Sequence, residues 1–106
     1  MGEFIRKHIS RVAPGHVTLL KNMAELRYGT DFVELFLNEP SKVLDLLINI
    51  YGGDEETATF IFKVLFIKPL ATWLGNSSLM EDFMRIIVMK RDNMKFKVLL
   101  QALCRE

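Results

Sequence analysis

The feature that most constrains this chain is the spacing of its glycine, proline and capping residues, which divide it into segments of helical length. Within these segments apolar residues recur every three or four positions, as on one face of an α-helix, and do not alternate as on a half-buried strand. The stop residues Gly29 and Gly52 are each followed by an acidic residue suited to cap a helix, Asp31 and Asp54. The pattern predicts an all-α fold.

The spacing of the glycine, proline and capping residues predicts a compact bundle of six or seven short helices. We expect helices at residues 4–12, 17–28, 32–37, 40–51, 55–74, 79–90 and 93–104. The segment 55–74 is expected to be the central buried helix, because its middle is apolar on every side but one. Periodicity alone also allows a buried strand there, but the acidic cap and the length favour a helix, with a bend at Pro69.

Finer features of these helices are also predicted. The first segment is expected to present one apolar face, and the second segment to use five apolar positions. These are Phe4, Ile5, His8, Ile9 and Val12 in the first, and Leu19, Leu20, Met23, Ala24 and Leu26 in the second. Ser78 and Glu81 have the spacing of a capping box for the helix at 79–90, and Asp92 or Asn93 is expected to cap the last helix.

Composition indicates one folded domain over residues 1–106. Half of the 106 residues are hydrophobic, and 14 Lys and Arg against 13 Asp and Glu leave a net charge of +1. Disorder is excluded, and the single cysteine, Cys104, cannot form an intramolecular disulfide or a structural zinc site. We therefore expect a cytoplasmic protein. Lys63, Lys68 and Pro69 interrupt the longest apolar stretch, so no membrane span is expected.

No motif of an enzyme is present. The glycines form no phosphate-binding loop, and His8 and His16 lie on either side of a Pro-Gly break, without the spacing of a metal-binding pair. We expect one of these histidines to be partly buried and the other exposed. Cys104 has no activating motif, and the acidic run 54–56 is explained by a helix start. We predict no catalytic residues, metal ligands or cofactor.

An apolar ligand held between phenylalanines is a minor alternative. The lining would be Phe32, Phe36, Phe60, Phe62 and Phe66. Because aromatic side chains contribute much of a small core, core packing explains these residues better than a ligand does.

The last two helices carry more apolar residues than one core face needs. In the last helix Phe96, Leu99, Leu100 and Leu103 form the core stripe, which leaves a second ridge at i, i+4 and i+8. We predict a protein-interaction surface that mediates self-association as a homodimer. Its residues are Val88, Met89, Met94, Val98 and Ala102. Additional core contacts made by other helices would also explain them.

A basic cluster at 85–97 suggests nucleic-acid binding as the alternative function. Its members are Arg85, Lys90, Arg91, Lys95 and Lys97. Such a cluster could contact phosphates. Cations also favour a helix C-terminus, where Lys90 and Arg91 are expected, and the last helix offers only Gln101 and lysines for reading bases. A solvated cluster is therefore the stronger interpretation.

One resemblance follows from the helix punctuation. The residues that carry it are Tyr28-Gly29, Phe32, Leu35-Phe36, Pro40, Leu44, Tyr51-Gly52 and Lys68-Pro69-Leu70. Over residues 26–100 this pattern resembles small archaeal all-helical domains of unknown function, some of which are regarded as output or regulatory modules. The resemblance implies a helical, cytoplasmic regulatory module and supplies no catalytic residues. We therefore expect a non-enzymatic interaction or regulatory module.

Overall fold

The computed structural model describes residues 1–104, and within them the chain forms seven helices and no strand. Helices α1 to α4 have the bounds Gly2–Val12, Pro14–Tyr28, Phe32–Asn38 and Pro40–Ile50. The fifth helix runs without a break through α5 (Glu55–Phe62), the π-helical segment η1 (Lys63–Ile67) and α6 (Lys68–Leu74). The sixth joins α7 (Leu79–Met84) to a second π-helical segment, η2 (Arg85–Met89), and α8 spans Asn93–Leu103. The predicted all-α fold is confirmed.

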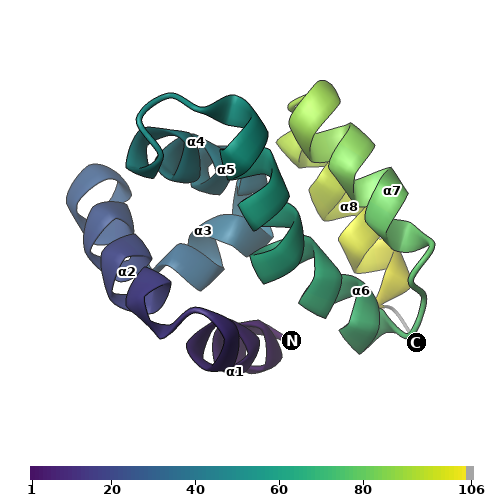
Figure 1. The fold of residues 1–106 in the computed structure, drawn as a ribbon. Helices are drawn as coiled ribbons and strands as arrows, with labels where there is room; N and C mark the ends of the chain where they lie inside the picture. The colour runs from purple at the N-terminus through teal and green to yellow at the C-terminus, as the bar shows by residue number, and fades with distance from the viewer. Residues whose placement is uncertain (105–106) are drawn as a thin grey trace.

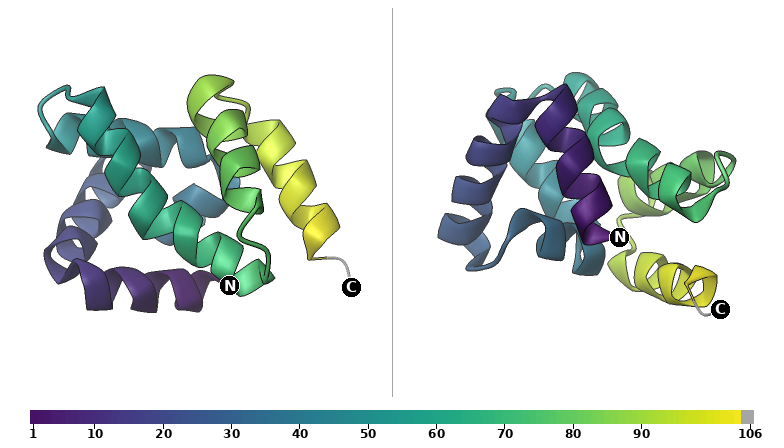
Figure 2. Two further views of the ribbon diagram at one scale, coloured as in Figure 1. Left: turned by 45° about the vertical axis from the view of Figure 1, so that its right-hand side comes forward. Right: turned by 90° about the horizontal axis from the view of Figure 1, so that it is seen from below.

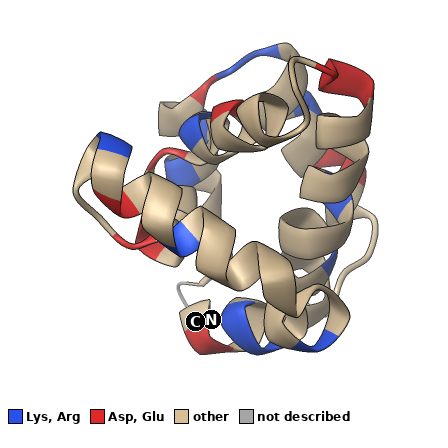
Figure 3. Ribbon diagram, turned by 60° about the vertical axis from the view of Figure 1, so that its left-hand side comes forward, with Lys and Arg blue, Asp and Glu red and all other residues tan. Residues whose placement is uncertain are grey.

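The long helix α5–α6 passes through the middle of the molecule. Helices α1 to α4 lie on one side of it, and the hairpin of α7 and α8 lies on the other (Figures 1 and 2). Helix α1 contacts both η1 and α6, while α4 contacts α5 and η2. The predicted central helix at 55–74 is therefore confirmed. Basic and acidic residues are interspersed over the helices (Figure 3).

Phenylalanine side chains form the centre of the core. The ring of Phe36, on α3, lies 4.9 Å from Phe66, 5.9 Å from Phe62 and 5.6 Å from Phe96, measured between centroids. Phe32 meets Phe66 edge to face at 6.2 Å. Four of the five residues predicted to line a ligand site, Phe32, Phe36, Phe62 and Phe66, are fully buried and pack ring against ring in the core. The fifth residue, Phe60, is 63% exposed, so the five do not line one site, and the structure supports core packing as the explanation of the other four.

Local sequence signals set several helix ends. The carboxylate of Asp31 accepts hydrogen bonds from the backbone N–H groups of Val33 and Glu34, and Asp54 and Asp92 cap α5 and α8 in the same way. Gly29 ends α2 with a φ of 65°, in the left-handed region that favours glycine. These predicted caps and the stop at Gly29 are confirmed.

The predicted capping box at Ser78 is wrong. The Ser78 hydroxyl makes no bond to the N-terminal N–H groups of α7 and instead donates to Oδ1 of Asn76 at 2.6 Å. The same Asn76 oxygen accepts the Ser78 N–H at 3.1 Å. An asparagine side chain that closes a local turn competes with the capping arrangement, and here the turn is formed.

The apolar faces of α1 and α2 are narrower than the sequence indicated. In α1, Ile5 and Ile9 are buried, whereas Phe4 and Val12 are 40% and 50% exposed. In α2 the buried residues are Leu20 and Ala24. Leu19 and Leu26 are exposed, because α2 packs against its neighbours through only a narrow strip. Helix α2 also begins earlier than expected, at Pro14, since proline is well tolerated in the first turn.

Pro69 is accommodated by a π-helical turn and a histidine from α1. The N–H of Lys68 donates to the carbonyl of Lys63, five residues back. In this register the carbonyl of Val64 would accept a hydrogen bond from the N–H of residue 69. Residue 69 is Pro69, which has no N–H. Nε2 of His8 lies 3.1 Å from that carbonyl and supplies a donor. A π-helical turn before the proline therefore replaces the simple bend that was expected.

Replacing His8 by alanine should lower the free energy of unfolding by about 1–3 kcal/mol, because the half-buried Val64 carbonyl loses its donor. The check is urea unfolding followed by circular dichroism. Lys7→Ala, at an exposed neighbouring position on α1, is the control and should change the value by less than about 0.5 kcal/mol. Equal effects of the two changes would contradict the role of His8.

The expected contrast between the two histidines is also wrong, because both are half-buried. Nε2 of His16 lies 2.7 Å from the hydroxyl of Tyr51, and the two rings are stacked with centroids 6.1 Å apart. This contact joins α2 to the end of α4. Each histidine therefore has a structural partner in a distant segment.

The cap of α5 predicts a specific pH dependence. Hydrogen bonds from the side chain and backbone of Thr57 lower the pKa of Asp54 below its ordinary value of 3.8. A carboxylate with a lowered pKa stabilises the fold above that ordinary value, and the contribution is lost as the pH falls through the folded-state pKa. Asp54→Asn keeps an acceptor but has no charge. Urea unfolding between about pH 5 and pH 2 should therefore show a shallower loss of stability for this variant, and identical slopes would contradict the prediction.

The helix Glu55–Leu74 is long and apolar enough, by length and composition alone, to cross a membrane, and 44% of its most apolar window is buried inside the fold. Its buried residues include Phe62, Phe66 and Leu70, which belong to the core. Core packing thus accounts for these buried residues, whereas Phe60 and Trp73 of the same helix are 63% and 45% exposed.

Candidate interaction site

The C-terminal hairpin of η2 and α8 is fixed to the rest of the fold by contacts with α3 and α4. The Asn93 side chain accepts the backbone N–H of Ser41 at 3.0 Å and donates to the Ser41 hydroxyl at 2.9 Å. On the inner face of α8, Phe96 is fully buried against Phe36 and Phe83. These contacts orient α8, so its opposite face is turned outward.

The outward face of α8 is the apolar ridge that the sequence predicts. Met94 is 79% exposed and Val98 is 63% exposed, and Ala102 one turn further along is exposed as well. No helix within residues 1–104 covers them. We call Met94, Val98 and Ala102 the α8 ridge. The competing explanation, that these residues contact the core, does not hold for this face.

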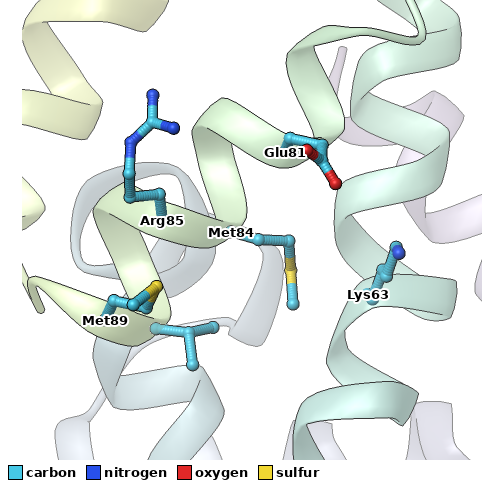
Figure 4. A pocket seen from close by; sticks show the side chains of 6 residues that line it. Lys63, Glu81, Met84, Arg85 and Met89 are labelled. Carbon is cyan, nitrogen blue, oxygen red and sulfur yellow. The ribbon is translucent and has the colours of Figure 1, made fainter.

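The other two predicted interface residues lie at a separate groove between η2 and the central helix. Val88 is half-buried and packs against the core, as the competing explanation expects, whereas Met89 is 78% exposed. They line a groove of about 360 Å³ together with Lys63, Glu81, Met84 and Arg85. Met84 extends toward the helix that carries Lys63, so the groove has an apolar floor and charged residues at its rim (Figure 4).

A shallow hollow of about 500 Å³ lies at the C-terminal end of α8 and is lined by Val98, Gln101, Ala102 and Cys104. The five predicted interface residues are thus divided: Val88 and Met89 line the groove, Val98 and Ala102 line this hollow, and Met94 lines neither. Within the hairpin, Met89 and Met94 stand on either side of the short turn at 90–92.

The predicted basic cluster is divided by ion pairing. Arg85 donates to Asp82 at 2.8 Å, and Arg91 donates to Asp45 at 2.6 Å. For Lys90, Lys95 and Lys97, no carboxylate of residues 1–104 lies within 4.0 Å of the ammonium nitrogen. Two members of the cluster are therefore neutralised locally, and three exposed lysines remain around α8.

The chemistry of this face is set by its apolar and cationic side chains. Among residues 1–104, no three His, Cys, Asp or Glu side chains are close enough together to hold a metal ion. No buried side-chain nitrogen or oxygen in that range lacks a hydrogen-bond partner. What this face presents is apolar area from α8 and the positive charge of Lys90, Lys95 and Lys97.

Sequence reasoning missed the groove and the contacts that hold the hairpin. Lys63 could have been recognised as a candidate surface residue of the central helix, because it is the single charged residue in the apolar run 60–67. The pairing of Arg91 with Asp45 and of Asn93 with Ser41 joins residues 46 and 52 positions apart, and no local pattern indicates it. Arg91 also has a φ of 52°, in the left-handed region that non-glycine residues rarely adopt.

Comparison with known proteins finds no match to this chain among family models, curated proteins or solved structures. The likeness to small archaeal helical domains therefore stays a prediction.

Proposed function

We propose that this protein is a non-enzymatic helical interaction module whose docking surface is the α8 ridge. The observation that carries the proposal is the exposure of Met94 and Val98, at 79% and 63%, on a helix whose other face is fully buried at Phe96. An amphipathic helix needs one apolar face for its own core, and a second such face is typical of a site for another helix.

The proposal includes self-association through this ridge, which is the homodimer that the sequence predicts. Methionine is well suited to such a surface because its flexible, polarisable side chain adapts to different contacts. Lysines flank the ridge, so pairing of two copies should be most evident at about 1 M salt, where the Debye length is about 3 Å and their repulsion is screened.

Methionine methyl NMR tests the proposal without any mutation. The chain has 6 methionines, which sit at different depths in the fold. When the protein is concentrated at about 1 M NaCl, we expect the methyl signal of Met94 to shift because its surroundings change. Met23 and Met80, which pack against the core, should not shift. Shifts at Met23 or Met80 alone, or no shift at all, would contradict the assignment of the ridge.

Nucleic-acid binding is a second candidate, favoured by the three lysines that are free of ion pairs within residues 1–104. It predicts binding of a duplex or single-stranded oligonucleotide that weakens steeply with salt and weakens further when Lys95 and Lys97 are replaced by glutamine. Fluorescence anisotropy of a labelled oligonucleotide at low salt measures this. The absence of binding there would remove the candidate.

A further inference from the structure

The residues beside the α8 ridge determine which helix can pack on it. Successive residues of a helix are rotated by about 100° around its axis. Lys95 and Lys97 therefore lie on opposite sides of the line through Met94, Val98 and Ala102. Both lysines are exposed, and no carboxylate of residues 1–104 lies within 4.0 Å of either ammonium group. The ridge is thus an apolar line with a positive charge on each side.

Two copies of this face cannot pair without bringing lysines together. Where helices pack along an apolar line, the flanking residues of one helix meet those of the other. In an antiparallel pair centred on Val98, Lys97 would meet its own counterpart, and Lys95 would lie on the same side as its counterpart, about 9 Å further along the axis. In a parallel pair Lys95 would meet the counterpart of Lys97. Either orientation opposes like charges, which disfavours a second copy at low salt.

We infer that the preferred occupant of the α8 ridge is an amphipathic helix of another protein whose apolar stripe is flanked by Asp or Glu. This inference rests on the proposed function, because it names the partner of the same surface. Acidic flanks would meet Lys95 and Lys97 with opposite charge on both sides, whichever way the partner helix runs. Lys90, exposed in the turn that precedes α8, adds a third positive charge to this hairpin.

A charge-swapped version of the protein serves as the acidic partner. Lys95→Glu/Lys97→Glu keeps the apolar ridge and reverses both flanks. The change is compatible with the helix, since residue 95 lies in the first turn of α8, where an acidic residue is favourable. Isotope-labelled wild-type protein is titrated with the unlabelled variant, with unlabelled wild type, or with Lys95→Gln/Lys97→Gln, and the signals of Met94 and Val98 are followed by NMR.

At about 0.1 M NaCl, where the Debye length is about 10 Å, we expect the charge-swapped variant to bind at least about tenfold more tightly than unlabelled wild type. The neutral variant should fall between them, and the differences should shrink at about 1 M NaCl. Equal affinities at about 0.1 M would overturn the inference and leave a second copy as the occupant. Absence of association at both salt concentrations would instead overturn the proposed function, and the inference with it.

Discussion

Replacing Phe36 by alanine is expected to lower the free energy of unfolding by about 3–5 kcal/mol, the usual cost of removing a buried phenylalanine. Phe36 is fully buried and contacts Phe62, Phe66 and Phe96, which lie on α5, η1 and α8. The cavity would open where three helices meet, so the surroundings cannot collapse to fill it. A chain of 106 residues has a total stability of about 5–15 kcal/mol, so this single change removes a large share of it.

The matched control is Phe60→Ala, the same chemical change at a position that is 63% exposed. It should alter the free energy of unfolding by less than about 1 kcal/mol, since surface substitutions have small effects. Urea unfolding by circular dichroism measures both. If the two variants lost the same stability, the phenylalanine cluster would not be the centre of the core.

Replacing Met94 and Val98 together by lysine is expected to abolish self-association of the protein at high salt. Burying an apolar side chain contributes about 1.5–3 kcal/mol, so the loss of two corresponds to a dissociation constant at least about a hundredfold weaker. Lysine is preferred to glutamate here, because glutamate on the ridge could pair with Lys95 and Lys97 of a facing copy. Both positions face outward, so the helical circular dichroism signal should be unchanged.

The single changes Met94→Lys and Leu26→Lys form a matched pair of controls. The two positions are 79% and 85% exposed, and each change replaces an apolar side chain by the same charge. Leu26 lies on α2, on the opposite side of the central helix from α8 (Figure 1). We expect Met94→Lys to weaken association and Leu26→Lys to leave it unchanged. An equal effect would show that net charge, and not the ridge, controls association.

Much of this fold could be predicted from sequence because its helix boundaries depend on neighbouring residues. Asp31, Asp54 and Asp92 cap helices through backbone groups two or three residues away, and Gly29 ends α2 through its own conformation. The central helix was predictable from its length and the cap at Asp54. Ser78 shows the limit of such reasoning, since its hydroxyl donates to Asn76 and does not accept from an N–H group of α7.

The parts that could not be predicted depend on contacts between distant segments. The π-helical turn before Pro69 requires a donor from His8, 56 residues away from Val64. The exposure of Leu26 depends on how narrowly α2 packs, which its own apolar spacing does not reveal. The α8 ridge was predictable as a surplus apolar face. That Val88 and Met89 line one groove while Val98 and Ala102 line another hollow depends on the geometry of the hairpin, which the sequence does not show.

The central claim is that the α8 ridge is a docking surface, and the most direct test is the solution mass by light scattering over a concentration series. At about 1 M NaCl we predict a mass that rises with concentration for the wild-type protein, and a mass that stays at the 12.3 kDa of the monomer for Met94→Lys/Val98→Lys. A wild-type protein that remains monomeric throughout, or a variant that associates as strongly as wild type, would contradict the account.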